Sequence, residues 1–262
     1  MALAPPETGS DEVLTRLVAQ LSSANRDEQR SACTALDTDM DAERAQALVD
    51  AGALRPLQAL LQAGEQAAEE AACAVVGRIS SSGSPACDHV VNGGCVPPLV
   101  KLLRSTLRGV QERAANVLAT LCEDENGDAR RDAVVDAGGV PCLVKLLDSE
   151  HGGVQQAAAG ALAMLSVDLA ANVIDAGGLP PLIKLLGAGC CGVQEAASRA
   201  LAKICADCCV DCVEDVVSAG ALPPLIRLLE ARHPGVQAAA LAALIAMCTD
   251  ACKEASYLGQ GP

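Results

Sequence analysis

Apolar residues recur along most of the chain at the three- and four-residue spacing of an amphipathic helix. In "VQERAANVLATLC", the side chains of Val110, Ala114, Val117, Leu118 and Leu121 fall on one helical face. Shorter segments such as "LPPLIKLL" carry a second apolar stripe, and their prolines stand in the first turn, where a missing N–H costs nothing. No long segment alternates apolar and polar residues as a half-buried strand does. The pattern therefore predicts an all-α protein.

One phrase recurs five times, as in "VNGGCVPPLVKLL" from Val91 and "IDAGGLPPLIKLL" from Ile174. Its central glycines are Gly52, Gly94, Gly138, Gly177 and Gly220, which are 42, 44, 39 and 43 residues apart. Self-similarity at this period indicates a solenoid, a propeller or another array. Propeller blades need four strands each, so the helical pattern excludes a propeller and predicts a solenoid. Each unit reads as a short first helix, a glycine corner, a short second helix and a longer third helix.

Three helices, a glycine corner and a period near 42 residues resemble the armadillo repeat. The resemblance implies a right-handed superhelical solenoid with three helices per repeat. HEAT repeats are less similar because they lack the short first helix with its glycine corner. We expect a tail over 1–10 and one armadillo domain over 11–262. Its units are a partial one at 11–40, then 41–81, 84–123, 126–166, 167–205 and 206–249, and a C-terminal tail at 250–262.

Composition and charge disfavour several classes of function. Apolar residues make up 51% of the chain, yet Phe and Trp are absent and Tyr257 is its one aromatic residue. The formal net charge of −14 disfavours nucleic-acid binding, which needs clustered Lys and Arg. No apolar run reaches the roughly 18 residues of a membrane span, and the N-terminal segment resembles no secretory signal. We expect an intracellular, reducing compartment, with the cytoplasm ahead of an organelle or cilium.

The stretch "ICADCCVDC" holds Cys205, Cys208, Cys209 and Cys212. In one continuous helix the outer sulfurs would lie roughly 10 Å apart, too far for one tetrahedral zinc. A tight corner could still bring them together, so a metal or redox protein stays an alternative. Because Cys205 aligns with Cys122, Ser80 and Ser166, we expect reduced, packed thiols and no metal or cofactor. The same expectation applies to Cys190 and Cys191.

No motif for catalysis occurs: there is no phosphate-binding loop after a strand, no Gly-x-Ser-x-Gly and no His-Glu-x-x-His. The acidic run Glu123–Asp128 lacks the spaced ligands of a calcium loop. We therefore expect a non-catalytic scaffold or structural subunit of a larger assembly. A peptide-carrying transport adaptor, or the substrate-binding part of a longer enzyme such as a ubiquitin ligase, remains an alternative.

The resemblance places a binding groove along the third helices. Adaptors of the nuclear-import type carry a Trp and an Asn on each of these helices. Here the Trp position holds Ala74, Asn116, Gly160, Arg199 and Ala242, and the Asn position holds Arg78, Thr120, Met164, Lys203 and Ala246. Without that ladder, recognition of basic signals is not implied. The candidate groove residues are Arg78, Asn116, Thr120, Met164, Arg199 and Lys203, whose charge favours an acidic or helical protein partner.

The last third helix, Val236–Cys248, has Gln237 as its one polar residue. A terminal repeat normally presents a polar outer face. Leu241 and Ile245 are therefore candidate binding residues for a partner, a second copy or a further stretch of the array. The alternative is that the segment from Asp250 to Leu258 covers this helix as a cap.

Overall fold

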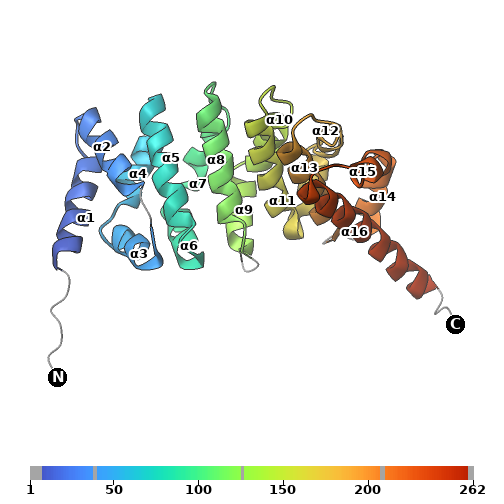
Figure 1. Cartoon of the computed structure of the whole chain (residues 1–262). Coiled ribbons are helices and arrows are strands. Elements are labelled where there is room, and N and C mark those ends of the chain that lie inside the picture. Colours follow the sequence, from blue (N-terminus) through green and yellow to red (C-terminus); the bar gives the residue numbers. More distant parts are fainter. Residues whose placement is uncertain (1–7, 38–39, 125–126, 207–209, 259–262) are drawn as a thin grey trace. The chain divides into compact units, whose positions relative to one another are not determined.

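The computed structural model describes residues 8–37, 40–124, 127–206 and 210–258, and within these it contains sixteen helices and no strand (Figure 1). The all-α prediction is thus confirmed. None of the described helices is long and apolar enough to cross a membrane. The chain divides into two compact units, Met1–Asp124 and Glu125–Pro262, and each is described by itself.

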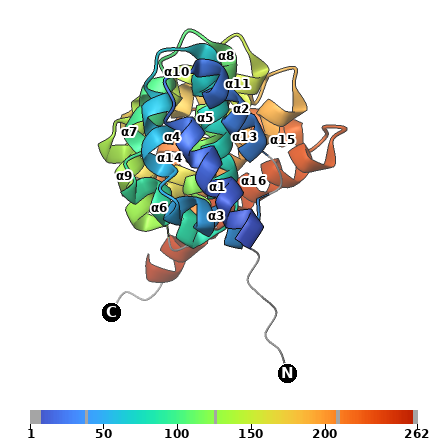
Figure 2. The ribbon, with the colours of Figure 1, turned by 90° about the vertical axis from the view of Figure 1, so that its left-hand side faces the viewer.

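Unit 1 holds two complete three-helix repeats behind an N-terminal helix pair. Its helices are α1 (Thr8–Leu21), α2 (Arg26–Leu36), α3 (Ala42–Asp50), α4 (Leu54–Leu61), α5 (Gln66–Ser80), α6 (Ser84–Asn92), α7 (Val96–Leu102) and α8 (Arg108–Leu121). The third helices α5 and α8 pack side by side (Figure 1), and α2 packs on the other side of α5. Figure 2 shows α1 in front, where it covers the first end of this unit.

Unit 2 continues the same order. Its helices are α9 (Asp128–Asp136), α10 (Gly139–Leu146), α11 (Gly152–Asp175), α12 (Leu179–Leu185), α13 (Cys191–Ala206), α14 (Val210–Ser218), α15 (Leu222–Leu228) and α16 (Pro234–Leu258). The helix α13 packs between α11 and α16, so three consecutive third helices form the centre of this unit.

Two helices run through the junctions at which the sequence suggested a break. The helix α11 joins the third helix of one repeat to the first helix of the next without a break near residue 166. The tail after Thr249 likewise continues α16 and does not begin a separate helix. Neither segment contains Gly or Pro, whereas glycines stand at the junctions before α6 and α9. Without a helix-breaking residue, the backbone simply continues its hydrogen bonding.

The corner glycines adopt the backbone conformation that their recurrence predicts. Gly52, Gly94, Gly138, Gly177 and Gly220 all have positive φ, between 72° and 87°. At one such corner, Gly177 N–H bonds to the carbonyl of Ile174, and Gly178 N–H bonds to that of Val173. These bonds satisfy carbonyls at the helix end while the chain turns sharply. A residue with a Cβ at the corner would be strained, because the left-handed backbone conformation is unfavourable for it.

A glutamine near the start of the third helices fixes the loop before it. Gln155 Nε2 donates hydrogen bonds to the carbonyls of Leu147 and Ser149, at 3.3 and 2.6 Å. Gln111 and Gln194 make the equivalent pair of bonds. Gln29 on α2 also bonds to the carbonyl six residues before it. The contact ties the end of the second helix to the third helix and satisfies part-buried carbonyls.

Replacement of Gly177 and of Gly160 by Ala tests the corner directly. Nothing lies within 4 Å of a Cβ added at either glycine, so neither change causes a clash. Gly177→Ala should destabilise the protein by about 1 kcal/mol through its positive φ. Gly160→Ala lies inside α11 and should stabilise it by up to about 1 kcal/mol. Urea unfolding measures both, and shifts of equal sign would contradict the corner assignment.

A second prediction compares two adjacent glutamines of α11. Gln155→Ala removes the two loop bonds and should lower the free energy of unfolding by about 1–2 kcal/mol. Gln156→Ala removes the same chemical group from an exposed position and should change it by less than about 0.5 kcal/mol. Thermal or urea unfolding of the two variants gives the comparison. Equal losses would show that the loop bonds do not stabilise the fold.

Candidate functional site

An open hollow of about 520 Å³ lies on unit 1 between α5 and α8. It is lined by Asp37, Cys73, Ala74, Gly77, Arg78, Ser81, Arg113, Asn116, Val117 and Thr120. Three of the candidate groove residues, Arg78, Asn116 and Thr120, therefore lie together. The floor is formed of small side chains, because α5 carries Ala74 and Gly77 where it meets α8.

Positive charge in this hollow comes from two arginines. Arg78 Nε lies 3.1 Å from Asp37 Oδ1, and both side chains are substantially exposed. Arg113 is exposed and makes no ion pair within the described residues. Asn116 stands one turn further along α8 with an exposed side chain, and Thr120 Oγ1 donates to the Asn116 carbonyl at 3.1 Å. The arrangement offers one guanidinium and one amide group to a ligand.

Sequence alignment on the family positions did not identify Arg113. It stands three residues before Asn116, one helical turn away on the same side of α8. A search for polar residues one turn from each candidate position would have found it.

The other three candidates belong to unit 2. Met164 is half-buried on α11, Arg199 is exposed on α13, and Lys203 is half-buried four residues later on the same helix. Arg199 Nη2 lies 3.9 Å from Glu195 Oε1, a weak contact between an exposed and a half-buried group. Arg199 and Lys203 therefore form a small basic surface on α13 of unit 2.

The C-terminal candidates are exposed apolar residues. Leu241 is 50% exposed and Ile245 is 53% exposed, and both line a shallow hollow of about 410 Å³ with Leu244, Cys248 and Thr249. Because α16 continues straight to Leu258, the tail does not fold back over these residues. The alternative in which Asp250–Leu258 caps this helix is therefore not what the structure shows.

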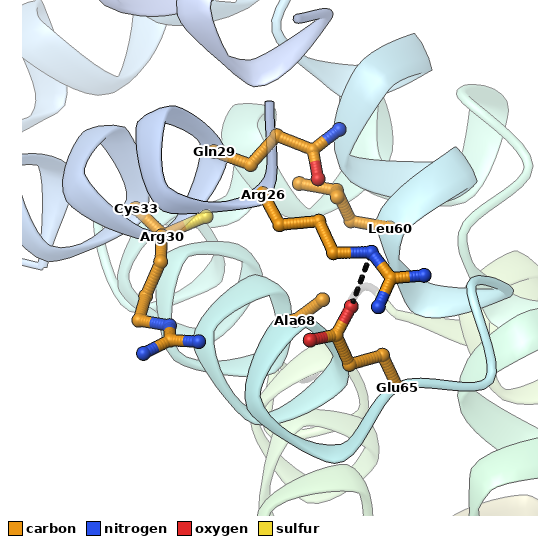
Figure 3. Close-up of a pocket in the computed structure, with 7 residues that line it drawn as sticks. All are labelled: Arg26, Gln29, Arg30, Cys33, Leu60, Glu65 and Ala68. Atoms are coloured by element: carbon orange, nitrogen blue, oxygen red, sulfur yellow. Dashed lines mark ion pairs between the residues drawn. The ribbon is translucent and has the colours of Figure 1, made fainter. Parts of the chain in front are cut away.

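A smaller pocket in unit 1 is closed by an ion pair (Figure 3). Arg26 Nε lies 3.1 Å from Glu65 Oε2, and the pair spans the space over Leu60, Ala68 and Cys33. The enclosed space is about 10 Å³, which is room for one water at most. This pocket does not offer a ligand site.

The cysteines separate into buried and exposed groups. Cys205 is buried near the end of α13, as its small-residue equivalents predicted. Cys212 is buried in α14 and is disulfide-bonded, which differs from the expectation of reduced thiols throughout; Cys208 and Cys209 lie outside the described residues. Cys190, Cys191 and Cys248 are exposed free thiols. Across the described part of the chain, no cluster of His, Cys, Asp or Glu could hold a metal ion.

Burial makes several thiols hard to ionise. It raises the pKa of Cys33 and of Cys95 to about 11 from the ordinary value of 9.0. For Cys73, burial raises the pKa to about 12 against the opposing effect of Arg113, with Glu69 and Glu70 raising it further. A buried thiolate loses its hydration without a compensating partner, so the protonated form is favoured.

Comparison with known families identifies the fold. The Armadillo/β-catenin-like repeat model matches residues 84–123, 127–167, 166–206 and 209–244, more than half of the chain. The chain therefore belongs to the armadillo repeat family, and its fold is an all-α armadillo-repeat solenoid. A search of curated protein sequences gave no match.

Several solved structures similar to this chain are engineered or designed proteins. One engineered protein has a TM-score of 0.86 at 33% identity, over 90% of this chain and 98% of that one. A designed armadillo repeat protein in complex with the peptide (KR)4 has a TM-score of 0.83 at 31% identity, over 89% and 99% of the two chains. A computationally designed armadillo protein for modular peptide recognition has 0.81 at 32%, over the same shares.

The burial of the cysteines predicts which thiols react. At pH 8 a thiol reagent should label Cys190, Cys191 and Cys248 in the native protein, and peptide mass spectrometry identifies the sites. Cys33, Cys73 and Cys95 should react after unfolding. Because their native pKa values lie above 9.0, their contribution to stability is complete below about pH 9 and is lost as pH rises toward 11. Rapid native labelling of Cys73 would contradict the close packing of α5.

Proposed function

We propose that this protein is a non-catalytic scaffold that binds other proteins, and that the hollow between α5 and α8 receives an acidic, extended segment of a partner. The observation that carries the proposal is Arg113, an exposed guanidinium in that hollow without an ion pair within the described residues. A guanidinium binds a carboxylate through two parallel hydrogen bonds, which fixes direction as well as charge.

The neighbouring groups suit a peptide more than a free anion. Asn116 offers both an amide donor and a carbonyl acceptor, the pair that one peptide bond of an extended chain requires. Arg78 is already paired with Asp37, so an incoming carboxylate would share or replace that carboxylate. The small floor at Ala74 and Gly77 leaves room for the backbone of the ligand to approach the helices.

The similar designed proteins support peptide binding by this fold, since one of them is in complex with (KR)4. In this protein, however, the hollow carries positive charge, the same sign as the (KR)4 peptide. Two arginines and one aspartate line the hollow of unit 1, so its local charge repels a basic peptide. On unit 2, Arg199 and Lys203 lie one turn apart on α13 and form a second basic surface. Met164 contributes an adaptable apolar side chain to unit 2.

A pair of peptides of opposite charge tests this proposal. We expect a labelled acidic peptide, (DE)4, to bind the protein more tightly than (KR)4 in fluorescence anisotropy at physiological salt, where the long-range effect of the net charge is screened. The double variant Arg78→Glu with Arg113→Glu should weaken binding of (DE)4 by roughly tenfold or more, because it removes charge-assisted hydrogen bonds. Equal or tighter binding of (KR)4 would instead favour the transport-adaptor alternative.

The control variant changes the same total charge elsewhere in unit 1. Arg16 on α1 and Arg55 on α4 are exposed and do not line the hollow. Changing both to Glu should affect the affinity only through long-range repulsion, an effect that salt screens. If the two double variants lose the same affinity at every salt concentration, general charge and not the hollow governs binding.

A further inference from the structure

The last repeat of unit 2 presents five apolar side chains that no described residue covers completely. We call this surface the end face, and it consists of Ile226, Leu229, Leu241, Leu244 and Ile245. Ile226 is 56% exposed and Leu229 36% exposed on α15, which packs on α16, the helix that carries the exposed Leu241 and Ile245. Exposed apolar residues gathered on two packed helices usually mark an interaction site.

The repeat register shows what these positions do in the preceding repeats. Ile245 aligns with Gly77, where an added Cβ would lie 3.2 Å from Val117 Cγ2 on the next third helix. Ile226 aligns with Gln58, whose Nε2 bonds to the carbonyl of Gly94 at the next corner. The end face therefore corresponds to the surface that covers the following repeat elsewhere in the array.

The side chains on this surface differ in size from their equivalents. The position of Leu241 holds Cys73, Ala115, Ala159 and Ser198 in the preceding repeats, and all four are buried. The position of Ile245 holds Gly77, Ala119, Ala163 and Ala202. Small residues allow the next third helix to approach closely, whereas Leu and Ile at both positions would force it outward. The end face is thus unsuited to another armadillo repeat at the internal spacing.

Among the described side chains of α1, the exposed surface is mainly polar. On this helix, which covers the first end of unit 1 (Figure 2), the exposed residues include Glu12, Thr15 and Arg16, with Val13 as the one large apolar residue among them. A head-to-tail contact would place the apolar end face against this polar surface. A contact between two end faces instead covers apolar residues with apolar residues, and a two-fold axis closes the assembly at two copies.

Glu230 is the charged residue that the register places toward the end face. It is exposed after α15 and makes no ion pair within the described residues. Its equivalent, Asp148, pairs with Lys184 of the following repeat at 3.1 Å. The last repeat has Arg227 in the position of Lys184, and Arg227 lines a hollow with Cys191 and Gln194 of α13, toward the preceding repeat. The apolar side chains, and not an ion pair, therefore carry the contact between two end faces.

We infer that the end face binds a second copy of this chain and forms an isologous dimer centred on Leu241 and Ile245 of α16. The inference rests on the proposed scaffold role for this face and is independent of peptide binding in the hollow. The face spans about one turn on each of two helices, so each copy buries on the order of 500 Å² at most. This area is at the low end for stable dimers, so we expect a dissociation constant in the micromolar range.

The test is the association state of the full chain by sedimentation velocity and light scattering from about 1 to 200 µM. We expect a reversible equilibrium that stops at two copies. Leu241→Glu with Ile245→Glu should raise the dissociation constant more than tenfold. Leu241→Ala with Ile245→Ala introduces the residue types of the internal repeats, keeps the helical circular dichroism signal and should weaken the dimer as well.

Val13→Glu is the matched control, because Val13 is 55% exposed on α1 and resembles Ile245 in exposure. It should leave the dimer unchanged, and loss of association in this variant would overturn the two-fold pairing in favour of head-to-tail contact. A monomer at every concentration, or growth beyond two copies, would also overturn the inference. Binding of (DE)4 is measured on the same variants, so failure of the hollow and failure of the dimer are distinguished.

Discussion

The close approach of consecutive third helices is the constraint on which the structure depends. In unit 1, α5 meets α8 through Gly77, at a distance that leaves almost no space for one more carbon. In unit 2, Ala159 and Ser198 are completely buried on α11 and α13. Helices packed this closely need small side chains at their contacts, and aromatic rings do not fit there. The absence of Phe and Trp from the chain agrees with this geometry.

Cysteine has a structural role in the same packing. Cys33, Cys73 and Cys95 are buried among apolar side chains, and burial raises the pKa of each thiol above its ordinary value. A protonated thiol is a small, polarisable apolar group, intermediate in size between Ala and Leu. The many cysteines therefore suit a core that combines Leu with small residues and contains no Phe or Trp, and most of the free ones need no chemical role to account for their position.

The hollow of unit 1 carries a local charge that opposes the charge of the whole chain. The net charge of −14 repels an acidic partner at long range, whereas Arg113 and Arg78 attract carboxylates at short range. Binding of an acidic segment would therefore depend on hydrogen bonds formed after contact, and its rate would increase as salt screens the long-range repulsion. Such a surface selects a partner by shape and hydrogen bonding more than by electrostatic steering.

The sequence by itself determined the repeat, the helices and the corners, because each of these depends on residues close together in the chain. The glycine phrase recurs in register, and a positive φ is a local requirement, so Gly177 and its equivalents could be assigned without a structure. Leu241 and Ile245 were identified for the same reason, since the polar residues of the other third helices are missing there. Their difference in size from Cys73 and Gly77 became meaningful once contacts across repeats were visible.

Tertiary structure decided what depends on neighbours. It placed Arg113 in the hollow with Arg78 and Asn116, although Arg113 does not align with the Trp or Asn position of the nuclear-import adaptors. It continued α11 and α16 through expected junctions, because a helix ends where capping or packing favours an end and not where a repeat is counted. The disulfide at Cys212 was not foreseen either, since pairing depends on which sulfurs the fold brings together. A repeated sequence specifies each unit, whereas the surfaces left uncovered depend on how the units pack.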